Sequence, residues 1–327
     1  MIRVGIVGLG MAVTPHAKSL LDLKHRVQVA YAFSPSAERR RKFAARFPFP
    51  QCDRLETILD DTAVDAVLVL TPPNTHLDIV ERCAAAGKHV LLEKPLEVST
   101  AKAEQLVKKT SRVKLGVVLQ HRFRPAAEKL REQLNGLGKL VSASAAIPNW
   151  RPQSYYDQPG RGTRWRDGGG VLLTQAIHTL DLFLSFVGEP LEVKSLVTTT
   201  SIHRMETEDL AVAVVRFNSG AIGTLHATTT AYPGFPERIE LIGTRGTAQL
   251  EGTSLKIQLQ DEKPFEIKTE SGAGGTGADP MAFPHDWHRG VLTDFLDSIE
   301  QNRDPRVSGA EALKVHRFID RILQSAG

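Results

Sequence analysis

Two motifs carry side chains that can move a proton. A Glu-Lys-Pro motif puts Lys94 directly after an apolar run, and a Gly-Gly-Gly run precedes Thr174 and His178. Thr174 and His178 are four positions apart, which puts them on one face of a helix, so that one can position what the other protonates. An isolated lysine is more often a surface residue and an isolated helical histidine is more often structural. Their combination favours acid–base chemistry by Lys94, His178 and Thr174.

A glycine turn follows the first apolar run. Gly8-Leu9-Gly10 comes directly after residues 2–7 and opens a segment with helical periodicity, the context in which backbone N–H groups can cradle a phosphate. The third glycine position of the dinucleotide fingerprint is Val13, so the fingerprint is incomplete. A glycine turn without a ligand is the alternative, but the alternation of strands and helices that follows favours a dinucleotide site.

The end of the second expected strand bears on the choice between NAD and NADP. It reads Tyr-Ala-Phe-Ser-Pro-Ser over residues 31–36 and lacks the acidic residue that would bind the ribose 2′-hydroxyl of NAD. Ser34 can donate to a phosphate, and Arg39 or Arg40 lies about one helical turn away. We therefore expect NADP to be favoured over NAD. The alternative is that these arginines form a solvated helix face.

The cofactor is expected to cross the carboxyl ends of the strands. A Thr-Pro-Pro-Asn-Thr-His segment at residues 71–76 follows one buried strand, and we expect its His76 to cap or line the turn rather than to do chemistry. The predicted cofactor-binding residues are Gly8, Gly10, Met11, Ala12, Ser34, Arg39, Thr71, Pro72, Asn74, His76, Glu93, Lys94 and Gln120.

Alternating elements must position these residues in the first third of the chain. Apolar runs rich in Val and Leu, without polar alternation, are typical of strands covered on both faces, and amphipathic segments separate them. The pattern predicts a Rossmann-type doubly wound parallel sheet in a dinucleotide-binding domain over residues 1–121. The expected strands are 2–7, 27–33, 66–70, 89–92 and 115–120, and the expected helices are 16–23, 37–47, 75–86 and 100–110.

The rest of the chain, residues 122–327, is expected to form an α+β domain for substrate binding and oligomerisation, with a large open, mostly antiparallel sheet. Its glycine-rich stretch 271–277 predicts a loop. Helices are expected at 172–186, 285–301 and 309–325, and residues 285–327 can alternatively pack back on the first domain. The expected strands are 138–147, 192–200, 210–217, 221–230, 238–243, 247–251 and 254–259.

Composition excludes several classes of protein. With 327 residues, 41% of them hydrophobic and 24% charged, the chain reads as a folded two-domain protein rather than a disordered one. No apolar run approaches the roughly 20 residues that a membrane span needs. The net charge of +4 is scattered, apart from a basic cluster at residues 39–42, and does not indicate nucleic acid. Cys52 and Cys83 lack a Cys-x-x-Cys spacing, so the sequence supports neither a zinc site nor a disulfide framework. We expect a cytoplasmic protein without a metal, membrane or nucleic-acid partner.

These motifs together resemble the Gfo/Idh/MocA (glucose-fructose oxidoreductase, inositol dehydrogenase and rhizopine catabolism) oxidoreductase family, over nearly the whole chain. The resemblance implies hydride transfer between nicotinamide C4 and a hydroxyl or carbonyl carbon of a sugar, sugar acid or cyclitol. It implies that Lys94 hydrogen-bonds the reacting oxygen near the nicotinamide and that His178 accepts or donates the proton. It also implies a homodimer or homotetramer formed through the face of the second domain's sheet.

One departure from the family pattern leaves alternatives open. Thr174 stands where many relatives have Asp, and a hydroxyl offers only neutral hydrogen bonding, so that proton transfer rests on His178 alone. One alternative is a glycoside-cleaving enzyme that recycles its nicotinamide. Another is a non-catalytic nucleotide-binding sensor, which both Thr174 and the incomplete glycine fingerprint favour.

The substrate residues are expected in and before the loop that precedes the Gly-Gly-Gly run. Its arginines, Arg161 among them, indicate an acidic or phosphorylated sugar, because guanidinium groups bind such groups at two points. Pairing with carboxylates of a neighbouring subunit is the alternative. Trp150 and Trp165 can equally be interface anchors or platforms that stack on a sugar. The predicted substrate residues are Arg122, Arg151, Tyr155, Tyr156, Arg164 and His178.

Overall fold

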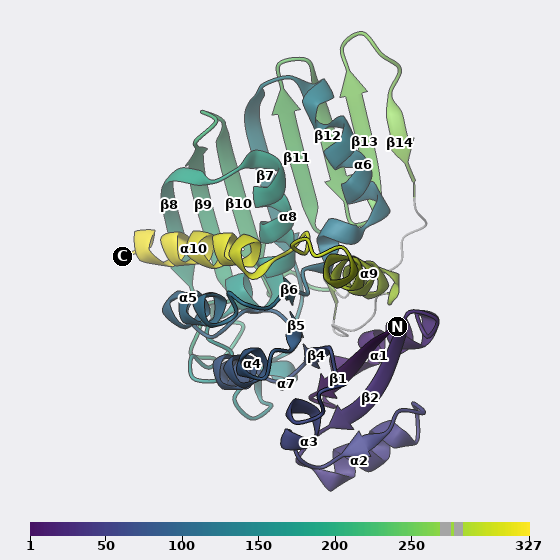
Figure 1. The fold of residues 1–327 in the computed structure, drawn as a ribbon. Helices are drawn as coiled ribbons and strands as arrows, with labels where there is room; N and C mark the ends of the chain where they lie inside the picture. The colour runs from purple at the N-terminus through teal and green to yellow at the C-terminus, as the bar shows by residue number, and fades with distance from the viewer. Residues whose placement is uncertain (269–275, 278–283) are drawn as a thin grey trace. The chain divides into compact units, whose positions relative to one another are not determined.

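The computed structural model describes residues 1–268, 276–277 and 284–327, and the chain divides into two compact units (Figure 1). The first unit comprises Met1–Gln120 and Pro284–Leu313, and the second comprises His121–Phe283 and Lys314–Gly327. Most of the predicted glycine-rich loop, residues 271–275, lies outside the described residues.

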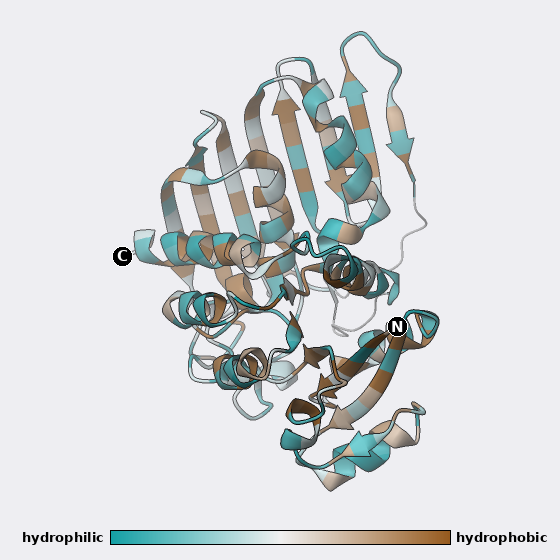
Figure 2. Ribbon diagram, in the orientation of Figure 1, coloured by the Kyte–Doolittle hydropathy of each residue, from teal (hydrophilic) through white to brown (hydrophobic). Residues whose placement is uncertain are grey.

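A six-stranded parallel sheet with the strand order β3-β2-β1-β4-β5-β6 forms the centre of the first unit. This order confirms the predicted doubly wound sheet. All residues of β4 are buried. Its sequence is apolar at every position, as expected for a strand with both faces covered, and this run is brown in Figure 2. The strands are β1 (Ile2–Val7), β2 (Val27–Phe33), β3 (Gln51–Cys52), β4 (Ala66–Val69), β5 (His89–Leu92) and β6 (Leu115–Val117).

Helices flank this sheet, and one of them comes from the far end of the sequence. Ion pairs at 2.7 Å, Arg26 with Asp297 and Arg289 with Asp22, join the late helix α9 to the segment around α1. The short elements β3 and α3 were not predicted, because two to four residues show no periodicity. The helices are α1 (Val13–Asp22), α2 (Ala37–Ala44), α3 (Glu56–Leu59), η1 (Pro73–Thr75), α4 (His76–Ala85), α5 (Thr100–Lys109) and α9 (Asp286–Glu300), and η2 (Gln120–Phe123) follows β6.

An eight-stranded sheet with the order β14-β13-β12-β11-β7-β10-β9-β8 dominates the second unit. Its neighbours run antiparallel except β7 and β10, which confirms the prediction of a mostly antiparallel sheet. The strands are β7 (Leu140–Pro148), β8 (Pro190–Thr198), β9 (Leu210–Phe217), β10 (Ile222–Thr228), β11 (Arg238–Gly243), β12 (Gly246–Glu251), β13 (Ser254–Leu259) and β14 (Phe265–Ile267).

The two faces of this sheet differ. Along β9 buried and exposed residues alternate, so that Phe217 is buried while Val212 and Val214 are exposed. In β13, whose sequence alternates polar and apolar residues, Figure 2 shows the matching alternation of teal and brown. Helices α6 and α8 pack on one face. The second unit's helices are α6 (Pro125–Gln133), η3 (Leu134–Leu137), α7 (Gln153–Tyr156), the π-helix η4 (Leu172–Ala176) and α8 (Ile177–Val187), and α10 (Gly309–Ser325) ends the chain.

Within the described ranges, no helix combines the length and the apolar character that crossing a membrane would require.

Candidate active site

The glycine turn between β1 and α1 has a backbone that only glycine tolerates at its first position. Gly8 has φ +105°, and a Cβ there would lie 2.8 Å from the backbone of Leu70. A Cβ on Gly10 would meet nothing within 4 Å, so the space beside this residue is open. Met11 is exposed, Ala12 is half-buried, and no side chain caps the first N–H groups of α1. The turn therefore fits an anion such as the diphosphate of a dinucleotide.

The end of β2 offers a hydroxyl and positive charge. Ser34 is buried, and its carbonyl oxygen accepts a hydrogen bond from Arg40 Nη1 at 2.5 Å. Arg39 is exposed on α2, whose first turn is capped by Ser36. Residues 31–36 contain no acidic side chain, so this strand end lacks the carboxylate that would bind a ribose 2′-hydroxyl.

His76 ties together the loops that follow β4 and β5. Its ring is buried, with Nε2 2.8 Å from the Thr71 carbonyl oxygen and Nδ1 3.0 Å from the Pro95 carbonyl oxygen. Burial lowers the pKa of His76, although these carbonyl groups and Glu97 oppose the shift. Its position agrees with a structural task in this turn, beside the half-buried Thr71 and Asn74 and the exposed Pro72.

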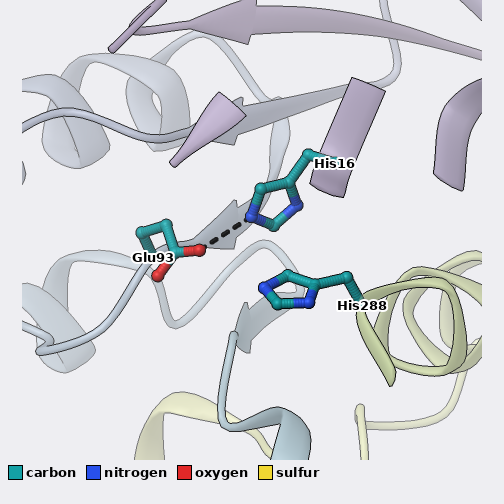
Figure 3. A group of neighbouring side chains, drawn as sticks. All are labelled: His16, Glu93 and His288. Atoms are coloured by element: carbon teal, nitrogen blue, oxygen red, sulfur yellow. Dashed lines mark hydrogen bonds and ion pairs between the residues drawn. The ribbon is translucent and has the colours of Figure 1, made fainter. Parts of the chain in front are cut away.

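Lys94 follows β5 and is half-buried, and beside it lies a cluster that the sequence reasoning missed (Figure 3). His16 from α1, Glu93 and His288 from α9 bring ligand-type atoms within 4.8 Å of one another. His16 Nε2 is 2.7 Å from Glu93 Oε1, and the Lys94 backbone N–H donates to Glu93 Oε2 at 3.1 Å. The only signal in the sequence was the polar residue His16 on the apolar face of a predicted helix.

Charge within this cluster is set by burial and by its hydrogen bonds. Burial opposes ionisation of Glu93, but the hydrogen bond from His16 and the positive charge of Lys94 outweigh it, so the pKa of Glu93 is lowered. Burial lowers the pKa of His288 to about 3, so this ring is neutral. The two imidazoles meet edge to face, with ring centroids 4.9 Å apart.

Gln120 lies at the end of the first unit's segment, just after β6. It is buried, and its Oε1 has no hydrogen-bond partner among the residues described. An orphaned buried acceptor fits a ligand that brings an N–H or O–H donor.

Thr174 lies in a π-helix, not in the regular α-helix expected. Its hydroxyl donates to the Gly170 carbonyl oxygen at 2.6 Å, and the helix becomes α-helical only from Ile177. Because a π-helix bonds i to i+5, a spacing of four no longer corresponds to one turn between Thr174 and His178. Glu208 accepts from the Gly170 and Leu172 N–H groups, and burial raises its pKa.

His178 is half-buried at the start of α8 and stacks on His121, with ring centroids 5.0 Å apart and planes 29° apart. Arg124 lies within hydrogen-bonding distance of His121 Nε2, and it also pairs with Glu237. Because a guanidinium can only donate, His121 Nε2 must accept, and its ring is then neutral. His178 therefore stacks on a ring that Arg124 holds at Nε2 and that has Glu237 3.9 Å from its Nδ1.

Several predicted substrate residues are engaged within the second unit. Arg122 forms a buried two-point ion pair with Asp181, at 2.7 and 2.6 Å. Arg151 is buried and donates to backbone carbonyl groups, including that of Trp150 at 2.7 Å. Tyr156 donates to Thr229 Oγ1 at 2.9 Å, and burial raises its pKa.

Other residues of the loop remain accessible. Tyr155 is half-buried, with Arg161 stacked over its ring at 4.7 Å, while Arg164 and Trp165 are exposed. Trp150 is half-buried against Tyr232, with ring centroids 5.4 Å apart. The loop thus presents an arginine and an indole to solvent, and this arginine pairs with Glu206 at 3.7 Å. The other arginines of the loop are engaged with side chains, Arg161 with the Tyr155 hydroxyl and Arg166 with Asp167.

Residues 2–121 match the sequence model of an oxidoreductase family with an NAD-binding Rossmann fold, and residues 128–249 match the GFO/IDH/MocA C-terminal domain. The chain is 29% identical to the myo-inositol 2-dehydrogenase of Thermotoga maritima, over 95% of this chain and 92% of that protein. It is 25% identical to the inositol 2-dehydrogenase of Rhizobium meliloti, over 99% and 96%.

A solved structure has the same fold. The WlbA dehydrogenase of Bordetella pertussis, in complex with NADH and UDP-GlcNAcA, superposes with a TM-score of 0.85 at 24% identity, over 99% of this chain and 96% of that one. The family models, the relatives and the strand orders agree, and the chain belongs to the Gfo/Idh/MocA family of NAD-binding oxidoreductases.

Proposed function

We propose that this protein is an NAD(P)-dependent dehydrogenase or reductase that moves hydride between the nicotinamide and a carbinol or carbonyl carbon of a sugar, sugar acid or cyclitol. The observation that carries the proposal is the glycine turn at Gly8, which leaves the N-terminus of α1 open to a phosphate in a chain of this family. Relatives named for inositol support the cyclitol end of this substrate range.

The cofactor would be held by residues of the first unit. The N–H groups of Gly10 to Ala12 would bind its diphosphate, since the Val13 N–H already donates to the Gly10 carbonyl oxygen at 3.3 Å. The turn at Thr71 to Asn74 would line its path. Gln120 Oε1, buried without a partner among the described residues, would accept a hydrogen bond from it. When bound, the nicotinamide supplies or accepts the hydride.

Two residues of this chain would handle the oxygen and its proton. Lys94 donates a hydrogen bond to the reacting oxygen, which stabilises negative charge there. When a carbinol is oxidised, the hydroxyl proton passes to His178, and in reduction His178 returns it to the carbonyl oxygen. Thr174 uses its hydroxyl on the Gly170 carbonyl, so it shapes the helix and adds no charge.

For the cofactor's 2′ position, Ser34 and Arg39 support NADP. Arg39→Ala should weaken NADPH binding by about tenfold and leave NADH binding within about twofold, because one charge-assisted hydrogen bond to a phosphate is lost. Arg41→Ala, an exposed arginine of the same helix, is the matched control. Equal weakening of both nucleotides by Arg39→Ala would refute the preference.

For the substrate, we propose that Tyr155, Arg164 and the exposed ring of Trp165 make the contacts. Three other predicted substrate residues are already engaged. Arg122 pairs with Asp181, Arg151 donates to backbone carbonyl groups, and the Tyr156 hydroxyl donates to Thr229. Arg151 and Tyr156 thus hold the loop in shape, and Arg122 joins η2 to α8. Arg164→Ala should raise KM for an acidic sugar more than for a neutral one.

The open face of the eight-stranded sheet supports a homodimer or homotetramer. Exposed apolar side chains on neighbouring strands form a patch, since Leu196 pairs with Val212 and both point to the same side. The patch comprises Leu196, Val212, Val214, Ile222 and Ile242. Val212→Glu should shift the mass measured by light scattering toward the monomer, and an unchanged mass would place the interface elsewhere.

The experiment that tests the function is a screen of sugars, sugar acids and cyclitols, followed through nicotinamide absorbance. Lys94→Ala and His178→Ala should each lower kcat by about 10²-fold or more with the best substrate, and leave nucleotide affinity nearly unchanged. Bound nucleotide without net turnover but with cleavage of glycosides would instead favour the recycling mechanism. Binding without any turnover would favour a sensor.

A further inference from the structure

The cluster of His16, Glu93 and His288 lies directly against Lys94 but is assigned no task by the function proposed above. Its residues come from α1, the end of β5 and α9, all within the first unit (Figure 3). His16 and His288 are only 1% and 3% exposed. Burying three ionisable side chains together is costly, so their retention indicates a specific task.

Two histidines and a carboxylate are also a donor set for zinc. The geometry of His16 speaks against an ion. Its Nε2 lies 2.7 Å from Glu93 Oε1, a hydrogen-bond distance, whereas two ligands of tetrahedral zinc lie about 3.3 Å apart. Its Nδ1 is buried without a hydrogen-bond partner among the described residues, although a metal-bound histidine almost always donates its second ring N–H. The cluster is therefore better explained by a proton shared in a hydrogen bond.

Both oxygens of the Glu93 carboxylate are used, and they face different parts of the chain. Oε1 binds His16 on α1, and Oε2 accepts the backbone N–H of Lys94. A carboxylate held at both oxygens fixes the backbone from which the Lys94 side chain projects. Its lowered pKa keeps it an acceptor at both positions.

We propose that His16 and Glu93 form a positioning pair for Lys94, with His16 as the anchor. The proposal rests on the function proposed above, in which Lys94 meets the reacting oxygen. The pair links the helix that starts at the glycine turn to the residue that carries the amine. His288 packs its neutral ring edge-on against His16 and restrains that ring without adding a positive charge beside Lys94.

The charged or titratable groups that act on Glu93 are His16 on α1, His288 on α9 and Lys94 itself. Replacing Glu93 by Gln therefore removes the negative charge of the cluster and keeps its shape. A nearby carboxylate favours the protonated amine, so Glu93→Gln should make Lys94 reactive at lower pH.

The test compares His16→Leu, which removes the donor, with His16→Gln, which retains an N–H, and with Glu93→Gln. His25→Leu, an exposed histidine of the same unit, is the matched control. The first readout is the pH dependence of Lys94 acetylation by acetic anhydride in nucleotide-free protein, measured by mass spectrometry. The second is kcat and KM with the best substrate from the screen.

We expect the pH of half-maximal Lys94 labelling to fall by about one unit in Glu93→Gln, which loses the carboxylate. It should fall by less in His16→Leu, because a carboxylate without its anchor is no longer held beside the amine. His16→Leu should lower kcat at least about tenfold with KM within about twofold, since misplacing a reacting group acts on the rate. His16→Gln should restore most of kcat. If His16→Leu does not fold, His16→Asn, which stays polar but is shorter, should show the same two changes.

The proposal is overturned if the pH dependence of Lys94 acetylation and the kcat of His16→Leu equal those of His25→Leu. It is equally overturned if kcat is as low in His16→Gln as in His16→Leu. It is also overturned if the purified protein carries one equivalent of metal that His16→Leu lacks. A wild-type protein that turns over no substrate refutes the proposed function instead, and Lys94 labelling still decides whether the pair positions the amine.

Discussion

The ion pair between Arg122 and Asp181 allows a sharp test of how the second unit is held together. The side chains are 9% and 1% exposed, and two hydrogen bonds join them at 2.7 and 2.6 Å. Removing one partner leaves the other charge buried and uncompensated, which costs about 3–5 kcal/mol of unfolding free energy. In a unit of this size that corresponds to a fall in Tm of about 6–20 °C.

The assay is thermal unfolding of Asp181→Leu, Arg122→Met and the double variant, followed by circular dichroism. Each single variant should lose stability. The double variant should recover most of it, because two apolar side chains can replace a buried pair at little cost. Since the guanidinium is engaged with Asp181, the double variant should also keep KM for the best substrate within about twofold.

Additive losses in the double variant would refute this reasoning, because the two side chains would then not interact. A stable double variant with a strongly raised KM would show that Arg122 contacts the substrate, and the scaffold role given to it above would be wrong.

Three further predictions concern single positions. Gly8→Ala should abolish measurable NADH binding, because its φ of +105° and the Leu70 backbone leave no room for a Cβ. Gly10→Ala, whose Cβ meets nothing within 4 Å, should have the Tm of the wild-type protein in thermal unfolding. Thr174→Asp tests whether position 174 still reaches His178 across the π-helix: a carboxylate within reach should raise the pH at which oxidation activity rises by about one unit, whereas Thr174→Val should leave that pH unchanged. His288 stays neutral in the folded state down to pH about 3, while the unfolded chain binds the proton below 6.5, so Tm should fall as the pH falls through this window. The Tm of His288→Gln should depend less steeply on pH. An equal slope of Tm against pH in the variant and the wild-type protein would contradict the burial argument.

The parallel sheet was predictable because its signal is local and redundant. Runs such as Ala66–Val69 are apolar at every position, which in a strand requires cover on both faces. The polar and apolar residues that alternate along Ser254–Leu259 likewise fit the strand observed there, which has one covered face. The attachment of α9 to α1 depends on ion pairs such as that of Arg26 with Asp297, between residues far apart in the sequence, and no local pattern specifies such pairs.

The site was predictable where a motif names it and not where packing decides it. The glycine turn and the position of Lys94 follow from strand ends, so Gly8 could be singled out from the sequence. The π-helix at Thr174 could not, because its sequence also suits an α-helix. The pairing of Glu93 with His16 depends on where α1 packs, which periodicity does not fix.

Binding of a nicotinamide dinucleotide at the glycine turn can be tested by titration. The purified protein, first checked by absorbance for nucleotide carried through purification and freed of it, is titrated with NADH and with NADPH while nicotinamide fluorescence is recorded. We expect saturable binding that Gly8→Ala abolishes, with the larger affinity for NADPH if Ser34 and Arg39 meet a phosphate. Absence of saturable binding of either nucleotide to the wild-type protein would contradict this expectation.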